Sequence, residues 1–528
     1  MRKYQQQQIL ALLKTIEEAL SASLFSDCKE GAEYIIRFIE SIVGKVSTSK
    51  GTTSVSLLKE FCEMLSVESS QDIDLKVLKK KLIKIENSIA EELKPTRLEV
   101  VFFPYQLSMF DSFRSVYLAA KADPACDVYC VPIPWFNRDT NGSLSTAHYD
   151  GYEYPADIEV VDWRTYDVAS RHPDVVFVHN PYDDYNLVTS VHPNYYSREL
   201  KNKTDLLVYI DYGLPAWVSK TPIAGTLVPS LTTYDVFTAY SEEYAHCLRF
   251  HFNNAAGCII KPEQDSVAVL GSPKFDMVIN TKKQDYVLPD KWQECIRGKK
   301  VLLFSTSLGA LLKNSEMFLN DIRYVLETLR KHEDIVLWWR PHPLSEETFA
   351  SMRPQLLAEY KNIVNNFNEE GLGIYDNTPD LHRAIAWSDA CYSDESSLMF
   401  LYLATQKPFS IRMTELPENC IDDTALDFTS ILETRIKNMQ TVEGANIFDA
   451  NCVIWWHNFA NADYTNNLRY DNFLERFIHF ILNESEYPQA GTYKELKAQM
   501  FHRFVENSDG SAGQKIYDYV KQKVWGVN

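Results

Sequence analysis

Several residue types and patterns are scarce in this chain of 528 residues. Glycine occurs 18 times and proline 22 times, which excludes collagen-like and low-complexity chains. No stretch reaches the roughly 18 consecutive apolar residues of a transmembrane helix, and the amino terminus has acidic residues where a signal peptide needs an unbroken apolar segment. These absences predict a cytoplasmic protein, with peripheral contact at the inner face of the membrane left open.

Paired cysteines and positive charge are also lacking. The 10 cysteines are scattered, without a C-x-x-C pair, and a disulfide framework is unusual in so long a chain, so we expect reduced thiols. We expect neither a metal ion nor a cofactor. Lys and Arg number 53 against 72 Asp and Glu, a net charge of −19. Such a chain is a poor general binder of nucleic acid, but a local basic pocket for a phosphorylated small molecule stays open.

What the chain does contain is a helical start. Residues 1–95 carry apolar side chains at helical spacing, and the last of these helices has Leu75, Leu78, Leu82, Ile85 and Ile89 spaced three-four-three-four. The spacing is typical of an antiparallel bundle that packs on itself or on the next domain. A coiled-coil seam that joins two copies of the chain is the alternative.

Short β-branched runs alternate with helical stretches after Pro95. This pattern predicts βα units with parallel sheets, and it restarts near residue 299. We therefore predict an α/β protein with two Rossmann-like domains that face a cleft, where ligands lie at the carboxyl ends of the strands. The predicted parts are helices over 1–95, an acceptor domain over 96–275, a nucleotide-binding domain over 276–430, and helices over 431–528 that pack back on the domains. The predicted strands include 158–163, and Trp455 and Trp456 are expected in the helical core of the last part.

Three strand ends in the second half carry polar residues suited to an anion. At 304–314, hydroxyls and backbone N–H groups pass from a strand into a helix, with simple N-capping as the alternative. At 337–344, prolines fix a turn that presents an arginine for phosphate and a histidine for proton transfer, unless this is only a surface loop. At 389–409, two serines precede an apolar helix, either as a diphosphate site or as a cap, and the acidic pair before them is expected to meet sugar hydroxyls or to orient neighbours. The predicted diphosphate and nucleotide ligands are Ser305, Thr306, Ser307, Arg340, His342, Asp394, Glu395, Ser396 and Ser397.

The run over 300–412 resembles the C-terminal half of the CDP-glycerol glycerophosphotransferase family, the teichoic-acid polymerases and primases. Residues 393–400 read S-D-E-S-S-L-M-F and match that family's T-D-Y-S-S-V-M-F segment at 5 of 8 positions. LGSPKFD at 270–276 is similar to the family's G-x-P-R-x-D, and ENSDGSAGQKI at 506–516 to its closing segment. The resemblance implies a GT-B fold and a CDP-polyol donor. It also implies that His342 stabilises the diphosphate and that Ser396 and Ser397 hold its oxygens.

One departure concerns the acceptor base. The family's W-H-G-T-P-x-K segment holds the presumed base, but YIDYGLPAWVSK at 209–220 has Tyr212 at the position of that histidine. A tyrosine with a pKa of about 10 is a poor base at neutral pH. The predicted catalytic residues are therefore His179, at the end of a strand, and Asp211, together with His342. A structural loop role is the alternative for His179.

Three kinds of function stay open at this point. The first is transfer of glycerol phosphate or ribitol phosphate from a CDP-polyol to an acceptor hydroxyl, on a polyol phosphate or a glycan, in the synthesis of a cell-wall or capsular polymer. The second is a GT-B glycosyltransferase or a UDP-sugar epimerase. The third is a non-catalytic protein that binds a nucleotide or a glycan, which the loss of the family's histidine favours.

Overall fold

The structure is a computed structural model that describes residues 1–43, 51–66, 74–139, 141–186, 188–214, 217–219, 233–255, 266–378, 380–394, 396–413, 425–427, 455–458, 473–486 and 490–525. Four of the described helices, at the amino terminus, share an apolar core of their own. They are α1 (Lys3–Ser21), α2 (Phe25–Val43), α3 (Thr52–Met64) and α4 (Leu75–Glu92). In α4, Leu78, Leu82, Ile85 and Ile89 are buried in this core, so the predicted seam faces the chain's own helices. Only Leu75 of that series lies exposed.

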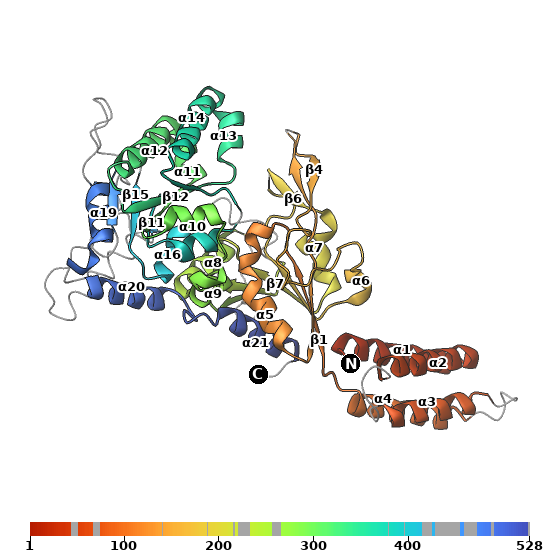
Figure 1. The fold of residues 1–528 in the computed structure, drawn as a ribbon. Coiled ribbons are helices and arrows are strands. Elements are labelled where there is room, and N and C mark those ends of the chain that lie inside the picture. Colours follow the sequence, from red (N-terminus) through yellow and green to blue (C-terminus); the bar gives the residue numbers. More distant parts are fainter. Residues whose placement is uncertain are drawn as a thin grey trace.

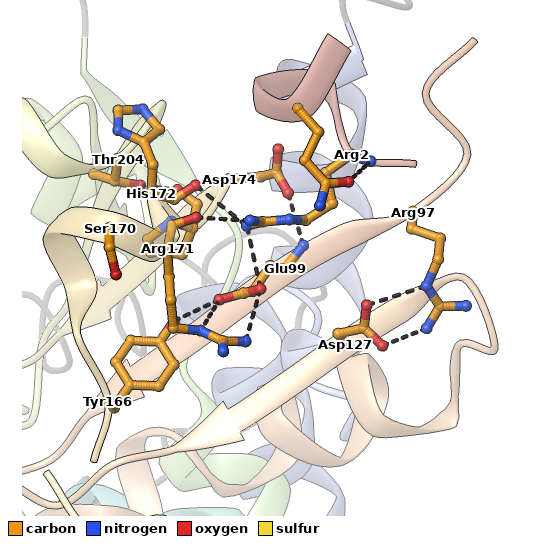
Figure 2. Close-up of polar contacts among 12 residues, drawn as sticks. Arg2, Arg97, Glu99, Asp127, Tyr166, Ser170, Arg171, His172, Asp174 and Thr204 are labelled. Carbon is orange, nitrogen blue, oxygen red and sulfur yellow. Dashed lines mark hydrogen bonds and ion pairs between the residues drawn. The ribbon is translucent and has the colours of Figure 1, made fainter. Parts of the chain in front are cut away.

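A buried polar network joins these helices to the rest of the chain (Figure 2). Glu99 is 4% exposed and accepts hydrogen bonds from Arg171 at 2.7 and 2.9 Å and from the Tyr166 hydroxyl at 2.9 Å. Arg2, which directly precedes α1, lies 3.2 Å from the same carboxylate and also donates to the main-chain oxygens of Arg171 and His172. This network lies at the amino ends of the strands, opposite the edge where ligands bind in such sheets.

The first α/β half is built on a parallel sheet of six described strands in the order β10-β9-β7-β5-β1-β2. Most of these strands are buried, as expected of a parallel sheet that is covered on both faces. The strands are β1 (Leu98–Phe103), β2 (Cys126–Cys130), β5 (Val175–Val178), β7 (Leu206–Ile210), β9 (Val236–Ala239) and β10 (Val267–Val269). The helical segments are η1 (Leu107–Ser112), α5 (Arg114–Ala122), α6 (Val168–Arg171), α7 (Ser197–Leu200), α8 (Glu242–Ala255) and α9 (Pro273–Asn280).

Smaller strands accompany this half. An antiparallel sheet joins β4 (Leu144–His148), β3 (Trp135–Arg138) and β6 (Thr189–Val191), and β8 (Trp217–Ser219) pairs with β16 (Ala425–Asp427). The strand predicted at 158–163 is wrong, because only a single bridge between Cys130 and Val160 forms there. The apolar run lies beside the edge strand for one residue pair and then leaves the sheet.

The second half repeats the plan with six described parallel strands in the order β13-β12-β11-β14-β15-β17. The strands are β11 (Lys300–Thr306), β12 (Ile335–Pro341), β13 (Gly373–Tyr375), β14 (Ala390–Asp394), β15 (Phe409–Met413) and β17 (Trp455–Asn458). The helices around them are α10 (Asp290–Ile296), α11 (Leu308–Lys313), α12 (Ser315–Leu329), α13 (Ser345–Met352), α14 (Pro354–Glu370), α15 (Leu381–Trp387), α16 (Ser397–Ala404) and α19 (Phe473–Leu482). The prediction of an α/β protein with parallel sheets is thus confirmed.

The end of the chain returns to the first half (Figure 1). After α20 (Ala490–Phe504), helix α21 (Ala512–Trp525) packs against α5, and its apolar residues join the core of the first sheet. Asp276 fixes the start of α21 by accepting the N–H groups of Ala512 and Gly513 at 3.1 and 2.7 Å. Gly271, with φ at +83°, is required nearby because a Cβ there would meet the Glu506 oxygen at 2.4 Å.

The sequence predicted that the last hundred residues are helical, but the described part of them also contains a strand. Trp455 and Trp456 belong to β17, which pairs in parallel with β15 and therefore extends the second sheet. A short run of aromatic residues fits a buried strand as well as a helix, and pairing with β15 decides between them. Among the described helices, none combines the length and the apolar character needed to cross a membrane.

The fully buried Asp174 makes the stability of the fold depend on pH. Its Oδ2 accepts the Glu99 N–H at 2.7 Å, whereas its Oδ1 has no hydrogen-bond partner among the described residues. Burial raises the pKa of Asp174 to about 6, above the ~3.9 of an unfolded chain. Because the folded state holds the proton more tightly, the stability that the protonated form supplies is lost as the pH rises from about 4 through 6.

We expect Asp174→Asn to raise the free energy of unfolding at pH 8 by roughly 1–3 kcal/mol, and the gain to shrink toward pH 4. The amide oxygen can still accept the Glu99 N–H, and position 174 no longer carries a buried charge. Urea unfolding at pH 8 and pH 5 measures this effect. Asp127→Asn is the control, because Asp127 is 38% exposed and pairs with Arg97, so its loss should cost at most about 1 kcal/mol. Equal stability of wild type and Asp174→Asn at pH 8 would contradict this reading.

Candidate functional site

The order of strands in the second sheet reverses between β11 and β14. β11 comes first along the chain but lies in the middle, so the connections from these two neighbours leave in opposite directions. Open parallel sheets bind their ligands at such a point, outside the carboxyl ends of the strands. The three polar stretches expected from the sequence all meet here: Thr306 ends β11, His342 follows β12 and Ser396 follows β14.

The three hydroxyl residues at the end of β11 have different surroundings. Ser307 caps α11, since its hydroxyl accepts the Ala310 N–H at 3.2 Å, and its own N–H donates to Asp394 Oδ2 at 2.6 Å. Ser305 pairs with Ser393 in the sheet. Thr306 is 2% exposed, and its hydroxyl has no hydrogen-bond partner within the described part of the chain. N-capping therefore accounts for the Ser307 hydroxyl, whereas the buried Thr306 hydroxyl is unpaired among the described residues.

The start of α16 provides a second hydroxyl of this kind. Ser396 occupies the N-cap position but makes no side-chain capping bond, and its buried Oγ has no partner among the described residues. The positive end of the α16 dipole and its first N–H groups lie at the same place. Glu395 and the side chain of Ser397 lie outside what the structure describes. Asp394 accepts the Ser307 N–H and so ties the β11 and β14 loops together.

His342 lies half-buried beside these groups. The main-chain N–H of His342 donates to the main-chain oxygen of Thr306 at 3.0 Å, which brings the β12 turn against the end of β11. Its Nδ1 accepts the Leu344 N–H at 3.1 Å, so the ring hydrogen of the neutral imidazole is on Nε2. Burial lowers the pKa of His342, and the nearby Asp394 carboxylate only partly offsets this. The imidazole is thus suited to donate one hydrogen bond as a neutral group.

Arg340, which the sequence predicted as a phosphate ligand, is largely used by the fold. It is 7% exposed, and its guanidinium donates to Asp376 Oδ2 at 2.9 Å and to the main-chain oxygens of Asp380 and Thr378 at 3.0 and 2.7 Å. Asp376 is fully buried and also accepts the Trp338 indole N–H at 3.0 Å. Arg340 therefore holds the loop between β13 and α15 in place.

His179 is likewise used by the fold. It is fully buried and stacked on Phe113 with ring centroids 4.4 Å apart. Its Nε2 accepts the Tyr105 N–H at 3.3 Å, and its Nδ1 lies 3.1 Å from the Ser112 hydroxyl. Burial lowers the pKa of His179 to about 3. With both nitrogens bonded and the ring covered, the geometry favours the structural alternative over a base.

Asp211 and Tyr212 are enclosed by other tyrosines. Asp211 accepts the Gly213 N–H at 2.8 Å and the Tyr244 hydroxyl at 2.6 Å. Burial raises the pKa of Asp211, which makes it a better base than an ordinary carboxylate, but both its oxygens already have donors. Burial also raises the pKa of Tyr212, whose hydroxyl lies 3.2 Å from that of Tyr182. Tyr212 is therefore neutral at physiological pH.

Sequence reasoning missed a cluster of three buried, charged or titratable side chains between the two halves. We call Asp111, Lys274 and His382 the junction cluster. Asp111 Oδ1 accepts from Lys274 Nζ at 2.9 Å, and Asp111 Oδ2 lies 2.9 Å from His382 Nε2. The three come from η1, α9 and α15, so they do not follow strand ends directly. Only Lys274, within LGSPKFD, stood in a stretch that the sequence had singled out. Among the described residues, no group of His, Cys, Asp and Glu could hold a metal ion.

Comparison with known proteins gives no family. No protein-family model matches the chain, and no curated protein matches it. A Listeria monocytogenes protein proposed to be a UDP-N-acetylglucosamine 2-epimerase has a similar structure at a TM-score of 0.47 and 13% identity, over 82% of this chain and 98% of that one. A variant of the wall teichoic acid polymerase TagF soaked with CDPG has a TM-score of 0.46 and 13% identity, over 90% and 99%. The S. aureus MnaA–UDP co-structure has a TM-score of 0.44 and 12% identity, over 81% and 97%. These values are too low to assign a function.

We expect Arg340→Ala to destabilise the protein by roughly 3–5 kcal/mol, because the fully buried Asp376 loses its main counter-charge. Chemical denaturation measures the loss. Arg330→Ala is the matched control, since Arg330 makes two hydrogen bonds to Glu370 at the surface, 34% and 38% exposed, and should cost at most about 1 kcal/mol. If Arg340→Ala were as stable as the control, the structural role given to Arg340 would be refuted.

Proposed function

We propose that this protein transfers a polyol phosphate from a CDP-polyol to an acceptor hydroxyl and releases CMP. The observation that carries the proposal is the pair of hydroxyls on Thr306 and Ser396, buried at the reversal point of the second sheet with no partner among the described residues. Buried polar groups in folded proteins are almost always hydrogen-bonded. Two buried hydroxyls without a partner beside the start of a helix therefore favour a ligand site. The likeness of residues 393–400 to a segment of the CDP-glycerol family supports a CDP-polyol as the donor.

Each group at this site has a role that its geometry supports. The hydroxyls of Thr306 and Ser396 donate to oxygens of the diphosphate, and the first N–H groups of α16 face the same charge. His342 donates from Nε2 as the leaving CMP gains negative charge. The acceptor oxygen forms a bond to the phosphorus that carries the polyol, and the bond from that phosphorus to the bridging oxygen of CMP breaks.

A sugar nucleotide is the second candidate donor. The described groups would contact only the diphosphate, which CDP-polyols and UDP-sugars share, and none of them is placed by the structure against a base. A GT-B glycosyltransferase or a UDP-sugar epimerase would therefore use the same hydroxyls. Thermal-shift and calorimetric titrations with CDP-glycerol, CDP-ribitol and UDP-N-acetylglucosamine distinguish the two, and turnover of the bound compound distinguishes an enzyme from a binding protein.

We expect Thr306→Val and Ser396→Ala to weaken CDP-polyol binding by roughly 1.5–3 kcal/mol each, because each variant removes a hydrogen bond to a charged group. Neither should lower the free energy of unfolding, since neither hydroxyl bonds to a described residue. Removing a buried, unpaired hydroxyl can even stabilise the fold. Calorimetric binding and urea unfolding of the same samples measure both effects.

Ser388→Ala gives the opposite pattern and is the control. Ser388 is 2% exposed in the same half, and its hydroxyl lies 3.1 Å from that of Tyr402 and donates to the Ile385 oxygen at 3.2 Å. Its removal should cost about 1 kcal/mol of stability and leave binding unchanged. Wild-type affinity for every tested nucleotide in both Thr306→Val and Ser396→Ala would refute the proposed site.

A further inference from the structure

A cavity of about 670 Å³ lies between the two α/β halves. On one side it is bounded by η1 and α5, and on the other by α9 and the start of α15. Its walls include the apolar side chains of Leu107, Phe110 and Met277, which can pack against the C–H faces of an organic ligand. Carboxylates outnumber cations in its lining and disfavour an additional negative charge there: Asp111, Glu153, Asp276, Asp285 and Asp380 against Arg114 and Lys274.

The junction cluster forms part of the cavity wall. Asp111, Lys274 and His382 all line it, and all three are about nine-tenths buried, with side-chain exposures of 11%, 11% and 9%. Burial alone would raise the pKa of the Asp111 carboxyl, but the Lys274 ammonium and the His382 contact more than offset it and hold that pKa well below its usual range. Asp111 is therefore a carboxylate that only accepts hydrogen bonds.

This carboxylate fixes which nitrogen of His382 carries the hydrogen. Nε2 lies 2.9 Å from Asp111 Oδ2, so Nε2 donates, and in the neutral ring Nδ1 keeps its lone pair. His382 Nδ1 is buried and has no hydrogen-bond partner among the described residues. A histidine that a carboxylate orients through one nitrogen, with the other nitrogen free, has the arrangement of a general base.

We propose that this cavity binds the acceptor, an uncharged polyol or sugar unit, and that His382 Nδ1 takes the proton of its reacting hydroxyl. The inference rests on the proposed function and supplies the base that His179, Asp211 and Tyr212 do not provide. Asp111 is the positioning residue, because it touches His382 and not the substrate.

The step balances with the two substrates alone. As the acceptor oxygen bonds to the phosphorus of the CDP-polyol, its proton moves to His382 Nδ1, and the electron pair of the broken P–O bond leaves with CMP. The imidazolium that forms is stabilised by Asp111, and its proton then passes to water. No oxidant, reductant or further reactant is needed.

His382→Gln tests this role while it spares the contact between the halves. A glutamine amide can still donate to Asp111, but it has no basic nitrogen. The donor probe is CDP-glycerol and the acceptor probe is glycerol. We expect CMP release in the presence of glycerol to fall by about 10²–10⁴-fold, with CDP-glycerol affinity and the unfolding midpoint unchanged.

A matched control exists elsewhere in the same half. His332 Nε2 lies 2.7 Å from Glu475 in another histidine–carboxylate pair, between the end of α12 and α19. His332→Gln should retain wild-type turnover. If His382→Gln instead keeps turnover within threefold of wild type, the junction cluster is only a joint between the halves and the inference is overturned.

A second readout keeps the inference separate from the proposed donor. In wild-type protein with ¹⁵N-labelled histidines, the His382 signals are identified by their loss in His382→Gln. Glycerol, ribitol or N-acetylglucosamine should shift the Nδ1 signal, because a hydroxyl then donates to it. If CDP-glycerol does not bind but this shift occurs, the proposed donor fails and the hydroxyl site stands. If none of the three compounds shifts the signal, the site fails whether or not CDP-glycerol binds.

Discussion

The position of the first strand of each sheet decides where this protein can bind a ligand. In both halves the chain enters the sheet in its interior and then adds strands on either side, so two neighbouring strands send their connections in opposite directions. The resulting gap lies between β1 and β5 in the first sheet and between β11 and β14 in the second. The two gaps are filled differently. In the first, the His179 ring packs against Phe113 and bonds to Tyr105 and Ser112. In the second, Thr306 and Ser396 leave hydroxyls that no described residue uses.

Neutral donors dominate the described part of this second gap because its arginine is already used. Arg340 pairs with the buried Asp376. The remaining donors are hydroxyls, an imidazole N–H and the backbone N–H groups at the start of α16. Such dipoles are held in place by the fold and need no rearrangement as charge develops. Asp394 does not oppose them fully, because its Oδ2 accepts the Ser307 N–H at 2.6 Å.

The strands and their polar ends could be predicted from the sequence, because both depend on local patterns. β-branched runs that end in turn residues identified most strands, and the three polar stretches do meet at one edge of the second sheet. What could not be predicted is which polar groups the fold has already used. Arg340 donates to Asp376, which lies 36 residues away in the sequence, and no local pattern around Arg340 predicts that partner. The 158–163 run failed for a similar reason, since its place beside β2 depends on tertiary contacts.

The junction cluster lies beyond local patterns for a further reason. Asp111 is separated from His382 by 271 residues, and each comes from a different half of the molecule. The carboxylate fixes the imidazole only while the two halves are in contact, so the orientation of His382 depends on their arrangement. If His382 is the base, as we propose, it is oriented for its role only while Asp111 and His382 are in contact across the two halves. On that proposal, the proton acceptor lies across the junction from the first sheet, where Tyr212 stands at the position at which the CDP-glycerol family has a histidine.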